Sequence, residues 1–329
     1  MTQATGEFDT TPARIVVHDP ATTGALDLVG RIPREDVKER SLFSAPPEPS
    51  AFGTHHAELV AAVRAAGIEV VELRELVREA RLRGQIERNP NQVYTRDAAI
   101  TLPWLPGWYI GGAMRMPVRR QEVAVVTAGL RALGLRELFT APQGCFLEGG
   151  DVIPAVIDGR RTLLVGFGPR TARRTLDLLW ERLAPWALDA VIGVRLAEWR
   201  MNLDGALVPV AGDTVVAHPG SIEAGFVLDP AGRRAVNVLG LLRNAGMTVV
   251  EVTKDEAMAQ QACNILCLGK RRVVCYDLCE RVIDALRDRD IAVRTVPGSE
   301  LIKGTGGPRC MTRPVYASRP AGSGSGEGA

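Results

Sequence analysis

Apolar and polar positions along the chain repeat one pair of elements five times. Residues 55–73, HHAELVAAVRAAGIEVVEL, place apolar side chains at the period of an amphipathic helix, then a glycine, then a short β-branched run. The same order returns at 121–138, 171–194, 232–252 and 279–296. Recurrence at intervals of about 45 to 65 residues predicts a helix-then-strand module that is used five times.

Further apolar stretches lie between these helix-then-strand units. Those at 161–168, 206–219 and 264–277 predict hairpins or adjacent strands around turns. Each module is therefore expected to mix strands and a helix, which makes the chain an α/β protein. Two arrangements fit: a cycle of five modules around a central cavity onto which the loops converge, or one doubly wound open sheet. The periodicity does not choose between them.

The modules fill residues 14–317, which we expect to form a single α/β domain. Residues 1–13 and the tail 318–329, which ends in GSGSGEGA, are polar and without periodicity, so both are predicted to be disordered. The chain has 329 residues and 46% hydrophobic content, which is ample for a buried core.

Charge and targeting signals narrow the class of protein. Forty Lys and Arg against 38 Asp and Glu leave a net charge of +2, and no dense basic block indicates a nucleic-acid or membrane surface. The N-terminus lacks the layout of a signal peptide, and no run of about 18 apolar residues occurs. We therefore expect a cytoplasmic protein, whose six cysteines are free thiols rather than a disulfide framework.

Two Cys-x3-Cys pairs could be mistaken for the four ligands of a zinc site. They are Cys263 with Cys267 and Cys275 with Cys279, in and beside a predicted hairpin. Structural zinc sites more often use short loop knuckles, so we expect core cysteines here and no metal. Cys145 is likewise expected to serve packing.

Four segments, each in a different module, carry polar side chains in strand and turn contexts. In 89–100, NPNQVYTRDAAI, Asp97 comes just before an apolar strand. In 145–154, CFLEGGDVIP, Glu148 and Asp151 flank two glycines, whose backbone freedom permits a tight turn that presents both carboxylates. Local ion pairing or turn capping is the alternative explanation for these acids.

The other two segments add an amide, a carboxylate and a thiol. In EWRMNLDGALVPV, Asn202 and Asp204 alternate, which would place both on the same face of a strand. In KGTGGPRCMTRP, Cys310 follows three glycines, and the adjacent Arg309 is expected to favour its thiolate form. Such a set suits a planar cation held by paired hydrogen bonds while a thiolate attacks it. A buried, unreactive cysteine is the alternative.

The strings NQVYTRD, LEGGDV, MNLD and GGPRCM, in this order, resemble the arginine deiminase branch of the guanidino-group modifying, or amidinotransferase, superfamily. The dimethylarginine dimethylaminohydrolases belong to the same superfamily. The resemblance runs from about residue 14 to residue 317. It implies a five-bladed α/β propeller, or pentein, with a central active site.

The resemblance also implies the chemistry of the site. Cys310 would be the nucleophile that attacks the guanidinium carbon and forms a covalent thiouronium intermediate. Glu148 would be its acid–base partner.

Substrate-binding roles follow from the same resemblance. Asp97 and Asp204 would grip the guanidinium nitrogens, and Asn91 would help to place the amino-acid end of the substrate. Arg119 and Arg170 match two arginines that bind a substrate α-carboxylate.

Two positions depart from the family pattern. Thr305 stands where a third carboxylate-binding arginine is expected, and Asn202 stands at the position of the catalytic histidine. An amide cannot exchange protons near pH 7 as imidazole does, and general acid–base assistance is worth roughly 10²–10⁴ in rate. The chain's histidines, which are expected in capping or surface roles, offer no obvious replacement: His18, His55, His56 and His218.

The sequence therefore favours a cysteine-dependent hydrolase that acts on the guanidino group of arginine or of an arginine-derived compound. We expect a small guanidino molecule as its partner, no cofactor and no metal, with a homo-oligomer left open. Two alternatives remain: amidino transfer to an amine, and a degenerate protein that binds guanidino ligands without turning them over.

Overall fold

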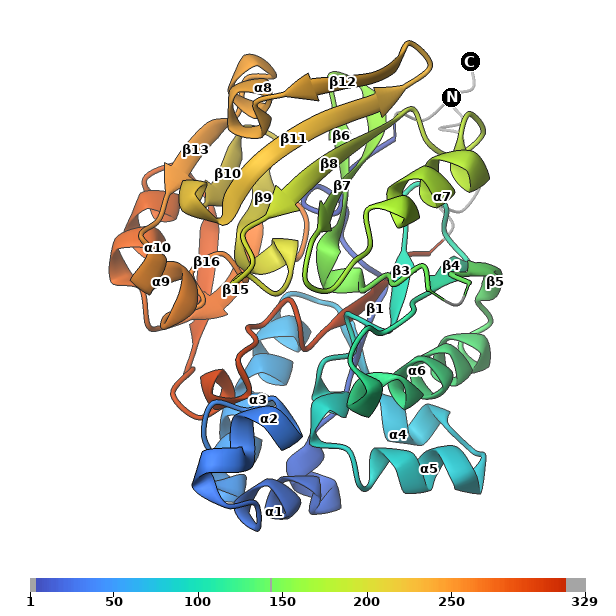
Figure 1. The fold of residues 1–329 in the computed structure, drawn as a ribbon. Helices are drawn as coiled ribbons and strands as arrows, with labels where there is room; N and C mark the ends of the chain where they lie inside the picture. Colours follow the sequence, from blue (N-terminus) through green and yellow to red (C-terminus); the bar gives the residue numbers. More distant parts are fainter. Residues whose placement is uncertain (1–3, 143, 318–329) are drawn as a thin grey trace, which may run out of the picture.

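The computed structural model describes residues 4–142 and 144–317. The predicted disorder of 1–3 and 318–329 lies outside these ranges. Within them the strands form five separate sheets (Figure 1). The alternative of one doubly wound sheet is therefore wrong, and the chain has a mixed α/β fold built from five sheets.

Each sheet contains the same local topology. A strand pairs antiparallel with the next strand of its sheet, and a helix then leads to a third strand that pairs parallel with the second. In one module these strands are β3 (Ala99–Thr101), β4 (Trp108–Gly111) and β5 (Arg136–Thr140), with α6 (Gln121–Ala132) before β5. The predicted unit at 121–138 is thus confirmed.

The other modules repeat this plan. One contains β9 (Leu207–Ala211), β10 (Thr214–Ala217), α8 (Val238–Asn244) and β13 (Thr248–Glu251). Another contains β14 (Leu266–Cys267), β15 (Arg272–Tyr276), α10 (Glu280–Arg287) and β16 (Ala292–Val296). The largest contains β6 (Val152–Ile157), β7 (Arg160–Phe167), α7 (Arg174–Leu183) and β8 (Ala190–Leu196), extended by β11 (Ile222–Asp229) and β12 (Gly232–Val236).

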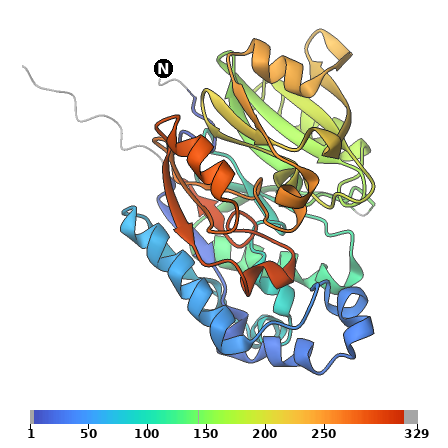
Figure 2. The ribbon, with the colours of Figure 1, turned by 90° about the vertical axis from the view of Figure 1, so that its left-hand side faces the viewer.

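The remaining sheet joins the two ends of the chain. Strand β17 (Arg313–Val315) pairs antiparallel with β1 (Arg14–Val17), and β1 pairs parallel with β2 (Glu69–Glu72). The helix before β2 is α3 (Pro49–Ala65), which the Glu48 side chain caps by accepting two backbone N–H groups. Figure 2 shows α3 alongside the strands of the β14–β15–β16 sheet.

Short elements connect the modules and carry the loops of the site. The α-helices are α1 (Ala25–Gly30), α2 (Val37–Ser41), α4 (Leu73–Leu76), α5 (Ala80–Ile86) and α9 (Lys254–Met258). The 3₁₀ turns are η1 (Pro20–Thr23), η2 (Arg34–Asp36), η3 (Pro90–Val93), η4 (Pro117–Arg119), η5 (Gly149–Asp151), η6 (Leu203–Gly205), η7 (Pro219–Ser221) and η8 (Leu301–Gly304). In the part of the chain that the structure describes, no helix has the length and apolar character to cross a membrane.

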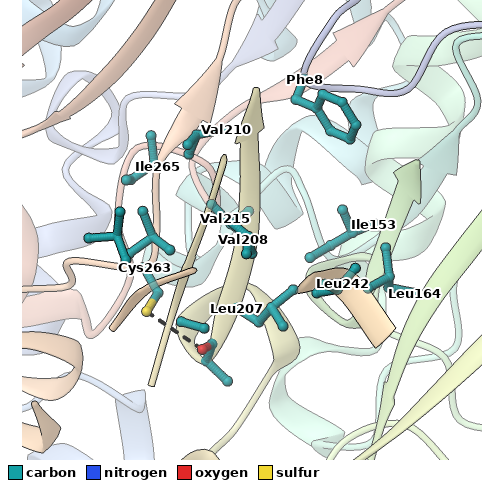
Figure 3. Packing of buried hydrophobic residues seen from close by; sticks show 14 of the residues in the cluster. Phe8, Ile153, Leu164, Leu207, Val208, Val210, Val215, Leu242, Cys263 and Ile265 are labelled. Atoms are coloured by element: carbon teal, nitrogen blue, oxygen red, sulfur yellow. Dashed lines mark hydrogen bonds between the residues drawn. The ribbon is translucent and has the colours of Figure 1, made fainter. Parts of the chain in front are cut away.

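Buried apolar side chains fill the space between the sheets (Figure 3). Four cysteines belong to this core, as the sequence predicts, and burial raises the pKa of Cys263 and of Cys275 to about 12. They are Cys263, Cys267, Cys275 and Cys279. Over residues 4–142 and 144–317, no group of three or more His, Cys, Asp or Glu side chains is placed to hold a metal ion.

The N-terminal segment differs from the prediction. Disorder was expected over residues 1–13, yet Phe8 lies in the core with 1% of its surface exposed (Figure 3). The Glu7 backbone N–H donates to the Pro154 carbonyl at 2.9 Å, which attaches the segment to β6. Two features outweigh the polar composition of this segment: one aromatic side chain that gains from burial, and one carboxylate with buried cationic partners.

Candidate active site

A small cavity lies where loops from different modules converge. It is lined by residues that follow or cap strands and 3₁₀ turns rather than by helix faces. Glu148 and Asp204 are almost completely buried behind this lining, where Glu148 contacts Asn202 and Asp204 contacts Cys310. The lining residues are Leu42, Asn91, Tyr94, Asp97, Arg119, Arg170, Met201, Asn202, Gly304, Thr305, Gly306 and Cys310.

Cys310 is held by an asparagine that the sequence analysis missed. Asn264 Nδ2 lies 2.9 Å from the Cys310 sulfur, and the Cys310 backbone N–H donates to Asn264 Oδ1 at 3.1 Å. The sulfur also lies 3.4 Å from Asp204 Oδ2. The signal that could have indicated Asn264 is a lone amide inside the apolar string NILCLG, where a buried polar side chain needs partners.

The surroundings of Cys310 favour the neutral thiol in the free protein. Burial raises the pKa of the thiol well above its usual range, and the carboxylates of Asp204 and Asp97 raise it further. Arg309 interacts electrostatically with Cys310 as expected, but burial and the carboxylates outweigh it. Its guanidinium is directed to Glu7 and to Asp204, with Nη1 at 3.0 Å from Asp204 Oδ2. The thiolate therefore has to be stabilised by something that enters the cavity.

Asp97 and Asp204 come together across a glycine. A Cβ on Gly150 would lie 2.6 Å from Asp97 Oδ1 and 3.3 Å from Asp204 Oδ2, so no other residue fits without displacing these carboxylates. The Gly150 backbone N–H also donates to Asp97 Oδ1 at 2.9 Å. The EGGD string thus serves the approach of the two carboxylates as well as carrying Glu148.

Arg119 is already paired with two acids. Its Nη1 donates to Asp97 Oδ2 at 2.8 Å, and its Nη2 donates to Glu122 Oε2 at 2.7 Å. Burial raises the pKa of Glu122 to about 7, against the opposing effect of Arg119. Glu122 was not anticipated, because its position in the first turn of α6 suggests a solvent-facing acid.

Asn202 and Asp204 are not on a strand as predicted. They lie at the start of the 3₁₀ turn η6, where Asn202 is the residue before the turn. The Asn202 amide Nδ2 lies 3.2 Å from Glu148 Oε2 and 3.2 Å from Asp151 Oδ2. Since both acceptors require the amide nitrogen, Oδ1 is the polar atom of this side chain that remains for a ligand.

Asp151 is a second acid behind Asn202. Its Oδ1 accepts the Leu203 backbone N–H at 2.8 Å. Burial raises the pKa of Asp151 well above its usual range, and the nearby carboxylate of Glu148 raises it further. The raised pKa favours the protonated form of the Asp151 carboxyl group.

Arg170, Thr305 and Asn91 also line the cavity, and of these three only Arg170 carries a charge. Arg170 Nη1 lies 3.5 Å from Glu148 Oε1, and its Nη2 lies 3.3 Å from the Met201 sulfur. Thr305 lines the cavity in a left-handed backbone conformation, with φ of 68°. Asn91 is buried, and its Nδ2 donates to the Ser41 carbonyl at 2.9 Å.

Tyr94 lies at the cavity, whereas the histidines lie elsewhere. Tyr94 lines the cavity and was missed, although it precedes the TRD string; its ring lies 5.6 Å from the Arg119 guanidinium carbon. Among the four histidines, all in the described ranges, none lines the cavity. Surface or capping roles are wrong for His18 and His56, which are buried, and His18 Nδ1 lies 2.6 Å from Glu72 Oε1.

The arrangement is suited to a small planar cation. Carboxylates of Asp97 and Asp204 and the amide oxygen of Asn202 offer acceptors from different loops, and Cys310 lies beside one of them. A guanidinium ion presents N–H donors in one plane and pairs well with such acceptors.

Comparison with known families agrees with this chemistry. The sequence model described as "Arginine deiminase" matches residues 82–317. The arginine deiminase of Mycobacterium avium is 30% identical over 266 residues, which cover 70% of this chain and 61% of that protein. That of Mycoplasma capricolum is 28% identical over 197 residues, covering 52% of this chain and 47% of that protein. The chain thus spans between 47% and 61% of the length of these relatives.

Solved structures support the fold. The N-terminal domain of ArgZ, described as an arginine dihydrolase from the ornithine–ammonia cycle in cyanobacteria, superposes with a TM-score of 0.69 at 19% identity over 92% of this chain and 97% of that domain. A dimethylarginine dimethylaminohydrolase adduct gives a TM-score of 0.64 at 16% identity over 92% of this chain and 99% of the other.

The protonation of Cys310 can be measured by alkylation. Because burial and two carboxylates raise the thiol pKa, we expect iodoacetamide to modify Cys310 slowly at pH 7. The rate should then rise about tenfold for each unit of increase in pH until the pH reaches that pKa. Asn264→Ala removes a donor to the sulfur and should move the profile to higher pH, whereas Asn244→Ala, on helix α8, should not. Peptide mass spectrometry assigns the site, and full reactivity at pH 6 would contradict this account.

Proposed function

Because the chain belongs to the arginine deiminase family, we propose that it is a cysteine-dependent hydrolase acting on the guanidino group of arginine or of an arginine-derived compound. The observation that carries the proposal is that Cys310 and Asp97 line one cavity, with the Asp204 carboxylate 3.4 Å from the Cys310 sulfur. No cofactor takes part in the steps below.

Binding of the cation begins with an exchange of partners. Asp97 leaves its ion pair with Arg119, 2.8 Å in the free protein, and accepts N–H groups of the substrate. Asp204 and the free Oδ1 of Asn202 accept others, so that the guanidinium plane is fixed on several sides. Arg119 remains held in place by Glu122, which keeps the exchange local.

The bound cation then activates the nucleophile. Its positive charge offsets the effect of the two carboxylates and lowers the pKa of the Cys310 thiol. The thiolate attacks the guanidinium carbon, a C–S bond forms, and the C–N bond to the leaving amine breaks as that amine takes up the proton that the thiol released. Water next attacks the thiouronium carbon, and the C–S bond breaks. One proton of this water restores the Cys310 thiol, and the other is taken up by the departed amine, which leaves as its cation.

The groups that donate and accept protons must differ from those of a mechanism with histidine at residue 202. Asn202 orients the substrate but does not exchange protons, whereas Glu148 and Asp151 lie on either side of its amide nitrogen. We assign Glu148 as the acid–base group, with Asp151 as the group that keeps a proton in its vicinity. This arrangement favours attack by Cys310 more than the later activation of water.

The outer end of the substrate would meet Asn91, Arg119 and Arg170. Arg119 and Arg170 supply the positive charges for an α-carboxylate, and Thr305 supplies none. Arginine therefore has a weaker clamp than three arginines would provide, and arginine derivatives with a smaller or uncharged outer end belong in the substrate panel.

The architecture fits this proposal. We infer that the five modules close into an α/β propeller and that residues 14–317 act as one catalytic domain. The pairing of β17 with β1, which brings the C-terminal strand beside the N-terminal one, supports closure. The active site then lies where the loops of the modules meet, near the centre.

Two other functions have specific support. Amidino transfer to an amine would need no water activation, which suits Asn202. A protein that binds guanidino ligands without turnover would explain both Asn202 and Thr305. Citrulline, ornithine or a new guanidino compound in the product mass spectrum separates deimination, dihydrolysis and transfer.

The proposal is tested by removing the thiol. Cys310→Ala should abolish turnover of L-arginine, agmatine and methylated arginines, because no other group on the cavity wall can form the C–S bond. Cys145→Ala is the matched control, since Cys145 is a half-buried free cysteine that does not line the cavity. Intact turnover in Cys310→Ala would refute the proposal.

The role of Asn202 is tested by restoring an imidazole. Asn202→His should raise kcat by about tenfold or more, with a new dependence on a group of pKa near 6.5, because general acid–base assistance returns. Asn202→Gln keeps the amide and should show no such gain. If calorimetry detects ligand binding to the parent while Asn202→His shows no turnover of any compound in the panel, the binding-protein alternative is correct.

A further inference from the structure

A carboxylate from the N-terminal segment lies behind the site, buried between two arginines. Glu7 Oε1 is 3.0 Å from Arg96 Nη1 and 3.2 Å from Arg309 Nε, and Glu7 Oε2 is 2.9 Å from Arg309 Nη2. The Glu7 side chain is only 6% exposed. In sequence the two arginines directly precede Asp97 and Cys310.

These arginines join the two loops that carry the chemistry. The Arg96 backbone N–H donates to the Cys310 carbonyl at 3.2 Å, and Arg96 Nε donates to the Arg309 carbonyl at 3.1 Å. Arg313 also donates to the Arg96 carbonyl. The orientation of each guanidinium thus fixes the spacing between Asp97 and Cys310, and Glu7 is the group that orients two of them.

Glu7 also balances charge beside the thiol. Arg309 is shared between Glu7 and Asp204, and the same Asp204 oxygen lies 3.0 Å from Arg309 Nη1 and 3.4 Å from the Cys310 sulfur. Although burial opposes its charged form, the guanidinium groups of Arg309 and Arg96 hold the pKa of Glu7 at about 2. Glu7 is therefore ionised throughout the working pH range.

The segment is fixed in place by packing. Gly6 lies against β6, where a Cβ on it would be 3.0 Å from the Ala155 Cα. Phe8 is in the core beside Ile153, and the Glu7 N–H is bonded to Pro154. The position of the carboxylate is thus set by neighbours on both sides of it.

We infer that Glu7 is a positioning residue of the active site: it divides Arg309 between itself and Asp204, and so leaves Asp204 free to grip a guanidinium beside Cys310. The inference rests on the function proposed above. Without the Glu7 charge, Arg309 would keep only Asp204 and the Val152 carbonyl as acceptors. The less compensated guanidinium would favour the thiolate, and the Asp97 and Cys310 loops would lose a common anchor.

The charged and titratable groups around the thiol set the background for a test. These groups are Asp204, Asp97, Tyr94, Tyr276 and Arg200. Of these, only Asp204 changes its partners when Glu7 is altered, because both acids bind Arg309.

The experiment compares the pH profile of Cys310 alkylation by iodoacetamide in variants of the full chain. In Glu7→Gln we expect the profile to move to lower pH by about one unit, which is about tenfold more thiolate below the pKa, while kcat/KM for L-arginine falls about tenfold, mainly through KM. Glu7→Asp, which keeps the charge one methylene further from the arginines, should shift by about half as much. Glu256→Gln is the matched control, because Glu256 also pairs with an arginine, Arg281 at 2.6 Å, but does not line the cavity.

The readout separates this inference from the proposed function. A folded Glu7→Gln protein with the parental alkylation profile overturns the positioning role, whether or not arginine is turned over. If Glu7→Gln does not fold, Glu7→Asp decides: a shift toward lower pH supports the inference, and the parental profile overturns it. A purely structural role would lower stability in both variants and leave the profile unchanged.

Discussion

The site depends on one shared carboxylate. Asp204 Oδ2 contacts the Arg309 guanidinium at 3.0 Å and the Cys310 sulfur at 3.4 Å, and Asp204 is only 1% exposed. A buried carboxylate is costly unless it is paired, so Arg309 permits Asp204 to be there, and Glu7 permits Arg309. Burial and the two carboxylates raise the pKa of the Cys310 thiol, and under the proposed function an entering guanidinium would lower it.

Sequence patterns predicted the framework well. The helix-then-strand repeat at 55–73 and its four successors correspond to observed elements, because a 3.6-residue period followed by a β-branched run is local information. Whether the strands form one open sheet or several separate sheets was not local information. It depended on pairings such as β17 with β1, whose residues are about 300 positions apart.

The sequence predicted which residues belong to the site better than it predicted which side chains contact one another there. Residues of the TRD, EGGD and GGPRCM strings do converge, but Asn264 was missed because its partner Cys310 lies in a different module. Glu122 was missed because its pairing with Arg119 is local, and only the tertiary fold buries that pair. Glu7 was missed because its segment is polar and short, and its two cationic partners lie far along the chain. The effect of Arg309 was overestimated, since adjacency to Cys310 in sequence did not reveal that its guanidinium is directed to Glu7 and Asp204.

The central claim is that Cys310 forms a covalent bond to a guanidinium carbon. Rapid acid quenching after mixing with L-arginine, agmatine or methylated arginines, followed by peptide mass spectrometry, tests it most directly. The account predicts a thiouronium adduct on the Cys310 peptide, accumulating because Asn202 activates water poorly. Its mass is that of the substrate less ammonia or methylamine where that amine departs, and that of an amidino group alone where the alkyl amine departs. Product formation with the Cys310 peptide unmodified at every quench time, and still open to alkylation, would contradict it.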